Sequence, residues 1–419
     1  MNPPWLRIVV VGHVDHGKST LIGRLLHDSG ALPDGRLEEI AGSSHGDAVE
    51  WAFLMDHFHE EREQERTIDS TQAFCATPKR ICRIIDAPGH KEFLKNMVTG
   101  AAQADAAILV VDVEAGVLEQ TRRHVAMLAM LGQRRVIMTI NKMDSAGGRR
   151  ESFQAVADAA RSLLRQLNIA AHAVIPISAR YGWNLATRAG EIAWYDGPTL
   201  FEALDSLALP EPLSQLPLRF PVQDICDFNG RRRLVGRIES GRMAQGQTVL
   251  CLPSGRTARI ASVERFLEDR TSAEAGESIG VTLDEPTESQ AGSLCHQVRR
   301  GEVFCNPETP ASVVRRIEAN LFWLADRGWA RGDALSLRCT TQEVPCRIES
   351  VRRRINSSTF ETMESNAARL EATEVGHVVI AVQQPLVVDE FAAGEPLGRF
   401  VLLKDDELSA GGTVTRAIS

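Results

Sequence analysis

Lysine is scarce in this chain of 419 residues: of 47 Lys and Arg side chains only six are lysine, at positions 18, 79, 91, 95, 142 and 404. Arginine stands wherever either cation would serve, so a lysine marks a place where a compact ammonium on a flexible stem is needed rather than a planar fork. Lys18 and Lys142 both fall inside sequence motifs, and we expect chemistry to hold them there.

Long apolar runs and paired cysteines are also absent. No stretch approaches the ~20 apolar residues that span a bilayer, and the N-terminus leads directly into a strand-like run at 6–11, so neither a membrane span nor a signal peptide is expected. The eight cysteines form no C-x-x-C pair and have no histidine at zinc-ligand spacing, which predicts reduced core residues of a cytoplasmic protein. The net charge of −8 argues against broad nonspecific binding of nucleic acid, while a tRNA docked through a local basic patch stays open.

A glycine-rich motif, G-x-x-x-x-G-K-S, lies between the strand-like run at 6–11 and a helical pattern at 20–26. This context is typical of a phosphate-binding loop, in which the glycines let successive backbone N–H groups approach phosphate oxygens. The N-terminus of the following helix attracts anions, Lys18 reaches the β and γ phosphates, and the Ser19 hydroxyl is placed for Mg²⁺. The predicted loop comprises Gly12, His13, Val14, Asp15, His16, Gly17, Lys18, Ser19 and Thr20.

A second motif indicates which base is bound. Asn141, Lys142, Met143 and Asp144 follow a strand-like run at 136–140. Asp144 can accept hydrogen bonds from the N1–H and the exocyclic amine of guanine, which adenine does not offer, and such sites reject analogues strongly. The asparagine is expected to brace the loop and the lysine stem to lie along the base. The backbone of Ser178, Ala179 and Arg180, after another strand-like run, would close a guanine pocket.

Two further segments are expected to sense the γ phosphate. Asp86, Ala87, Pro88, Gly89 and His90 follow a strand-like run at 81–85. In this segment Asp86 should hold Mg²⁺ through water, the Gly89 N–H should contact the γ phosphate, and His90 should orient or polarise the attacking water.

The other sensing segment contains Thr67, which follows Glu65 and Arg66. Its hydroxyl would hold Mg²⁺ and its N–H would contact the γ phosphate, although a threonine before the β-like run at 68–74 also fits an ordinary strand start. The predicted catalytic residues are therefore His90, Lys18 and Thr67, and the predicted Mg²⁺ ligands are Ser19, Thr67 and Asp86.

Together the five motifs resemble the translation-factor class of GTPases. Three longer strings, at 19–29, at 61–64 followed by 67–69, and at 120–124, resemble the large, GTP-binding subunit of sulfate adenylyltransferase more than an elongation factor that carries aminoacyl-tRNA. This resemblance implies GTP hydrolysis with Mg²⁺, coupled to formation of adenylyl sulfate and pyrophosphate from ATP and sulfate on a separate small catalytic subunit.

Two other functions stay open. His16 and the string at 96–103 are shared with elongation factors, which keeps an aminoacyl-tRNA carrier in consideration. The sulfate adenylyltransferase family usually has Asp-Asp-Gly-Lys-Ser in its phosphate loop and Gly-Ile before the switch threonine. This chain has Asp15-His16-Gly17-Lys18-Ser19, and Glu65-Arg66 replaces the glycine that gives the switch backbone its freedom, so a regulatory GTPase with slow turnover is the third candidate.

The expected fold is an α/β P-loop GTPase domain with a doubly wound, mostly parallel sheet, followed by two all-β barrel domains. The chain length predicts two or three domains, and proline-rich breaks place them at 1–208, 217–304 and 311–419. The last helix of the first domain should begin after Thr199. The arginine clusters 231–233 and 352–354 are expected to be solvated hairpin turns.

Overall fold

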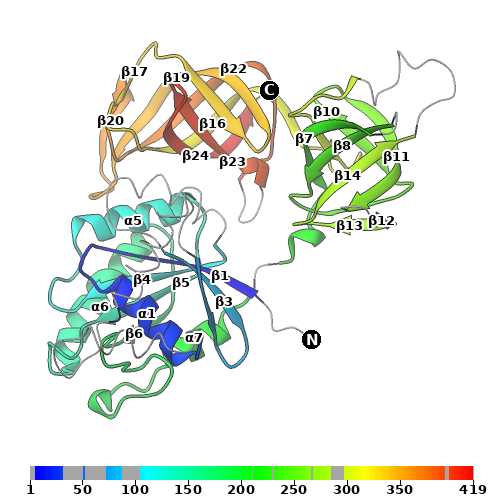
Figure 1. The fold of residues 1–419 in the computed structure, drawn as a ribbon. Coiled ribbons are helices and arrows are strands. Elements are labelled where there is room, and N and C mark those ends of the chain that lie inside the picture. The colour runs from blue at the N-terminus through cyan, green and yellow to red at the C-terminus, as the bar shows by residue number, and fades with distance from the viewer. Residues whose placement is uncertain are drawn as a thin grey trace. The chain divides into compact units, whose positions relative to one another are not determined.

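The structure is a computed structural model that describes residues 5–31, 51, 72–86, 104–209, 211–228, 231–265, 268–284, 297–391 and 396–418. The chain divides into two compact units, Met1–Leu209 with Ser357–Thr359, and Pro210–Asn356 with Phe360–Ser419. Helices and a sheet form the first unit, and the second is built from strands (Figure 1).

The first unit is organised by one mostly parallel sheet with the strand order β2-β3-β1-β4-β5-β6. Only β2 runs antiparallel to its neighbour. Buried Val, Ile and Leu side chains fill β1 and β4, as expected for strands covered on both faces. The strand bounds are β1 Trp5–Gly12, β2 Gln72–Ala76, β3 Ile81–Asp86, β4 Ala106–Asp112, β5 Val136–Asn141 and β6 Ala171–Pro176.

The helices of the first unit connect these strands. They are α1 (Lys18–Asp28), α5 (Glu119–Met130), α6 (Arg150–Gln166) and α7 (Leu200–Ser206), with a short 3-10 turn at Gly190–Ile192. Thr199 caps α7 in a reciprocal capping box with Glu202, which confirms the predicted helix start. No helix in the described part of the chain is long and apolar enough to cross a membrane.

The second unit contains two seven-stranded sheets, in each of which six strands close into a ring, which confirms the predicted pair of β-barrels. The strands of the first barrel and its small accessory sheet are β7 Arg219–Phe228, β8 Arg231–Arg237, β9 Arg242–Ala244, β10 Thr248–Leu252, β11 Arg256–Arg265, β12 Glu268–Arg270, β13 Ser272–Glu274, β14 Ser278–Leu283 and β15 Val303–Cys305. The first barrel has the order β10-β15-β7-β8-β14-β11-β12 and closes through pairing of β10 with β11.

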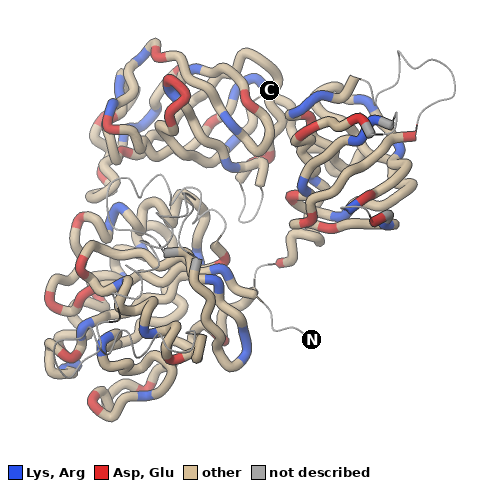
Figure 2. Tube along the Cα trace, viewed as in Figure 1, with Lys and Arg blue, Asp and Glu red and all other residues tan. Residues whose placement is uncertain are grey.

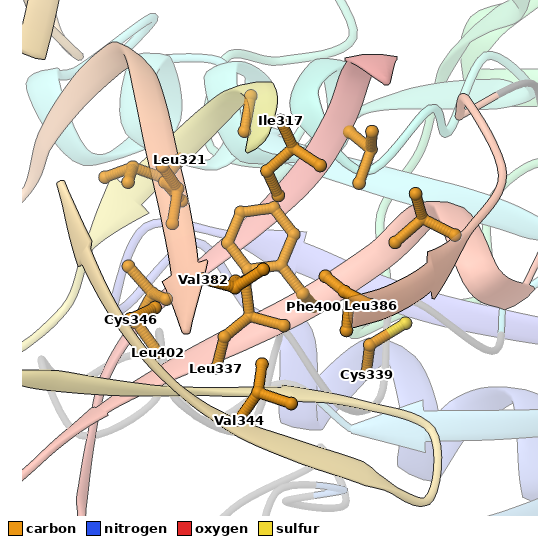
Figure 3. Packing of buried hydrophobic residues seen from close by; sticks show 14 of the residues in the cluster. Ile317, Leu321, Leu337, Cys339, Val344, Cys346, Val382, Leu386, Phe400 and Leu402 are labelled. Carbon is orange, nitrogen blue, oxygen red and sulfur yellow. The ribbon is translucent and has the colours of Figure 1, made fainter. Parts of the chain in front are cut away.

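The second barrel repeats this architecture. Its strands and their accessory pair are β16 Ser312–Trp323, β17 Trp329–Ala330, β18 Leu335–Cys339, β19 Gln342–Asn356, β20 Thr362–Ala367, β21 Arg369–Leu370, β22 Glu374–Val388, β23 Arg399–Lys404 and β24 Glu407–Ile418. The order is β18-β23-β24-β16-β22-β19-β20, closed by β18 with β19. Side chains from several strands converge in its core, among them Ile317, Leu337, Leu386 and Phe400 (Figure 3). Buried and exposed residues alternate along β18 and β19, because successive side chains of a strand point to opposite faces and one face packs on the core.

The prediction that the arginine clusters are solvated turns is wrong. Arginines 231–233 begin strand β8, where Arg233 forms an ion pair of 2.8 Å with Glu264. Arg354 lies in β19, is 7% exposed, and donates through two nitrogens to Glu374 at 2.7 Å each. Acidic and basic residues are interleaved along the strands of both barrels (Figure 2). The acidic partners are distant in sequence, so local composition could not reveal them.

The described cysteines are free thiols, and all but one are buried. Burial raises the pKa of several of them, including Cys346, whose pKa rises to about 12. Cys226 is the exception because it is exposed, contrary to the prediction that it is a core residue. Cys295 lies outside the described residues.

Candidate nucleotide-binding site

The predicted phosphate loop joins β1 to α1 and approaches its neighbours too closely for a side chain at either glycine. A Cβ at Gly12 would lie 2.4 Å from the Val110 carbonyl oxygen. At Gly17, where φ is +84°, a Cβ would lie 2.5 Å from the side-chain nitrogen of Asn141. The loop therefore requires its glycines for close packing against β4 and β5, as well as for the left-handed backbone at Gly17.

The start of α1 has the features of an anion site. Its N-cap is Gly17, which offers no side chain to the first-turn N–H groups, and Ser19 lies in that first turn. Lys18 is 7% exposed and its Nζ donates to the carbonyl oxygen of His13 at 2.8 Å. The ammonium is thus held inside the loop, beside the N-terminus of α1 and the positive end of its helix dipole. These residues fit the phosphates of a nucleotide.

Asn141 connects the phosphate loop to the second half of the site. Its Nδ2 donates to the His16 carbonyl oxygen at 2.9 Å, and its Oδ1 accepts from the Ala179 N–H at 2.9 Å. The side chain is 2% exposed, so both bonds are protected from water. The expected brace is present, and it joins three loops rather than one.

The other predicted base-binding residues lie around this connection. The Met143 N–H donates to the Ile177 carbonyl oxygen at 3.1 Å, which ties the loop after β5 to the segment after β6. Ser178 and Ala179 are buried, whereas Arg180 is exposed. Asp144 is half-buried.

One histidine of the phosphate loop and one histidine of α5 stay uncharged near neutral pH. Burial lowers the pKa of His16 to about 4, against a smaller opposing effect of the Val110 carbonyl. Burial also lowers the pKa of His124, on α5, to about 3, and the Lys18 charge acts in the same direction. Lys18 therefore carries the positive charge among these three side chains near neutral pH.

The structure describes only Asp86 of the two segments that are predicted to contact the γ phosphate. Asp86 ends β3 and pairs in register with Val10, so its backbone reaches the same sheet edge as the phosphate loop. Thr67, Ala87, Pro88, Gly89 and His90 lie outside the described residues, as does the string at 96–103. Their predicted roles stay predictions.

A phosphate loop on a parallel sheet, a brace to an Asn-Lys-Met-Asp loop, and two β-barrels after it define a GTP-binding protein of the translation-factor type. A family model described as the elongation factor Tu GTP binding domain matches residues 4–210, and one described as GTP-eEF1A C-terminal domain-like matches residues 316–415. The chain belongs to this family of elongation-factor-like GTPases.

Similar proteins carry different names. Elongation factor 1-alpha of Archaeoglobus fulgidus is 36% identical over 404 residues, covering 95% of this chain and 94% of that protein. Bifunctional enzyme NodQ of Rhizobium sp. strain N33 is 35% identical over 407 residues, covering 95% of this chain but 61% of its own length. A crystal structure of Sup35 complexed with GDP aligns over 100% of this chain and 95% of that one, with 23% identity and a TM-score of 0.46.

His90→Ala is expected to leave GTP affinity nearly unchanged and to slow hydrolysis by about 10²–10⁴-fold, because a residue that orients or polarises the attacking water acts on the chemical step. Single-turnover phosphate release, beside GTP affinity, measures the two effects separately. His172→Ala is the matched control, since His172 is an exposed histidine on β6 that contacts Ser206. Unchanged turnover in the His90 variant would contradict the assignment.

Proposed function

We propose that this protein is the GTP-hydrolysing subunit of a sulfate adenylyltransferase, with adenylyl sulfate and pyrophosphate formed from ATP and sulfate on a separate small subunit. The observation that carries the proposal is the similarity of the strings at 19–29 and 120–124 to that family. The first string covers most of α1, and the second lies on α5, where Thr121 and His124 are buried. The similarity of 95% of this chain to the bifunctional enzyme NodQ supports the proposal.

The proposed role has a clear energetic logic. Formation of adenylyl sulfate is uphill, so a partner must supply free energy. A GTPase supplies it when its GTP and GDP forms bind the catalytic subunit with different affinity, because a ligand shifts an equilibrium only by its differential affinity for the two states. Mg²⁺ held by Ser19, Thr67 and Asp86 would neutralise charge on the β and γ phosphates, and the Ser19 position at the start of α1 fits that role.

An aminoacyl-tRNA carrier is the second candidate, and a specific observation favours it. Elongation factor 1-alpha proteins match nearly the whole chain, with 94% of the Archaeoglobus fulgidus protein covered. His16 of the phosphate loop also follows the elongation-factor pattern rather than the Asp of the sulfate family.

A coupling assay tests the first proposal. With the small subunit, ATP and sulfate present, this protein should raise adenylyl sulfate above its equilibrium yield only when hydrolysable GTP is supplied. A non-hydrolysable GTP analogue should support binding but not the sustained yield, because continuous work requires cleavage of the γ phosphate. Sulfate-dependent pyrophosphate release is the measurement, and Lys18→Ala protein is the negative control.

The same preparation separates the two candidates. Filter binding with charged tRNA should show no GTP-dependent retention if the protein serves sulfate activation. Tight GTP-dependent retention of aminoacyl-tRNA, together with no sulfate-dependent pyrophosphate release, would replace the first proposal by the second.

A further inference from the structure

A buried carboxylate that no nucleotide motif includes holds the lysine of the Asn-Lys-Met-Asp loop. Asp112 is the last residue of β4, and it pairs in register with Asn141 at the end of β5. Its Oδ2 lies 2.7 Å from the Nζ of Lys142, and its side chain is 9% exposed against 42% for the lysine. A carboxylate shielded from water attracts an ammonium more strongly than an exposed one does.

The rest of Asp112 is fixed in place by backbone groups. Its Oδ1 accepts from the Glu114 N–H at 2.8 Å and from the Ala115 N–H at 3.3 Å. Its own N lies 3.3 Å from Nδ1 of His16 in the phosphate loop, a ring nitrogen that is also 3.3 Å from the Val110 carbonyl oxygen. The two carboxylate oxygens therefore act separately, since Oδ1 closes the turn after β4 while Oδ2 faces Lys142.

Asp112 also keeps its charge. Burial alone would raise its pKa, but the hydrogen bonds from Lys142 and from the Glu114 and Ala115 amides outweigh burial and hold the pKa below its usual value. The carboxylate is therefore ionised throughout the neutral range. The Lys142 ammonium therefore lies beside a fixed negative charge.

Lysine, rather than arginine, stands at position 142 in a chain that has only six lysines. An arginine would complete the same ion pair, so the ion pair alone does not explain the choice. A flexible apolar stem that can lie flat along a base does explain it, provided that the ammonium is anchored beyond the base. Asp112 is placed to be that anchor.

We propose that Asp112 is a positioning residue for guanine-nucleotide binding, which fixes the Lys142 stem beside the base by holding its ammonium. The inference rests on GTP binding and not on the choice between sulfate activation and tRNA delivery. It extends the base site from the loop after β5 to the end of β4. The carboxylate is not expected to take part in hydrolysis, because it faces the lysine of the base loop and the turn after β4.

Asp112→Asn removes the charge while keeping the shape and the acceptor for the turn. The dissociation constants of GDP and GTP should both rise, by about 3- to 10-fold, since the pair is charge-assisted but partly screened at the lysine. The GDP-to-GTP affinity ratio and the turnover at saturating GTP should not change. Glu114→Gln is the matched control, because it removes an exposed negative charge in the same turn and should leave nucleotide affinity unchanged.

A double-mutant cycle with Lys142→Met distinguishes positioning from a general structural role. Methionine keeps an apolar stem but loses the ammonium, so Asp112→Asn should then change the dissociation constant by less than about 2-fold. Equal losses in both backgrounds would overturn the proposal. If Asp112→Asn does not fold, Lys142→Met alone must weaken GDP and GTP by the same factor, and unchanged affinity would overturn it as well. Wild-type protein that fails to bind GDP would instead refute the nucleotide site itself.

Discussion

Lys18→Ala protein is expected to lose measurable binding of GTP and GDP, a fall in affinity of at least about 10³-fold, because a buried phosphate without its counter-charge is strongly disfavoured. The lysine is buried by its own loop, with only 7% exposure, and its ammonium is held by the His13 carbonyl at 2.8 Å. His16 and His124 are uncharged neighbours, so neither can replace its positive charge. Titration with a fluorescent guanine nucleotide measures the loss.

Two variants make this result specific. Lys18→Arg keeps the charge, yet a planar guanidinium is broader than an ammonium and should restore little binding in a loop closed by Gly17 and Asn141. Lys79→Ala removes an exposed lysine from the turn between β2 and β3 and should bind as the wild type does. An affinity of Lys18→Ala for GTP and GDP within a few-fold of the wild type would contradict the assignment of this loop to phosphate.

The first unit could be predicted closely from sequence because its signals are local. Buried parallel strands are continuous apolar runs, and every motif except the Thr67 segment directly follows one of them. These motifs therefore gather at the carboxyl edge of the sheet. Asn141 shows the limit of this reasoning. Its motif predicts a brace, but the partners His16 and Ala179 come from two other loops and are brought to it only in the folded sheet.

Residues that depend on distant partners could not be predicted from sequence. Asp112 belongs to no motif, and only the register of β4 against β5 brings it to Lys142. An aspartate directly after the apolar run at 106–111 is the signal that the sequence offers. The neighbouring arginines favour a solvated turn for Arg354, while its partner Glu374 lies on another strand. In both cases strand pairing, which is non-local, decides the environment.

Asp144→Asn is expected to reverse the base preference of the site, from GTP toward xanthosine triphosphate. The aspartate would accept hydrogen bonds from the N1–H and the exocyclic amine of guanine. In the variant the asparagine oxygen still accepts from N1–H, while its amide donates to the oxygen that xanthine carries in place of the amine. Sites built to pair polar groups reject a mismatched partner by about 10⁴–10⁵-fold, and we expect a change in the GTP-to-xanthosine-triphosphate affinity ratio of that order.

The loop around Asp144 should keep its structure in the variant, so a change in nucleotide affinity reports base recognition and not misfolding. The bonds that shape it include those of the Asn141 side chain and those of backbone groups from Lys142 to Gly148, and Asp144 is partly exposed. Thermal unfolding should therefore match the wild type, as it should for Asp158→Asn, a change of equal charge at an exposed position on α6. Inosine triphosphate, which lacks the exocyclic amine, should bind the wild type more weakly than GTP does. The difference in affinity between these two nucleotides should be smaller in the variant. Equal GTP affinity in wild type and Asp144→Asn would mean that the site does not read guanine through this carboxylate.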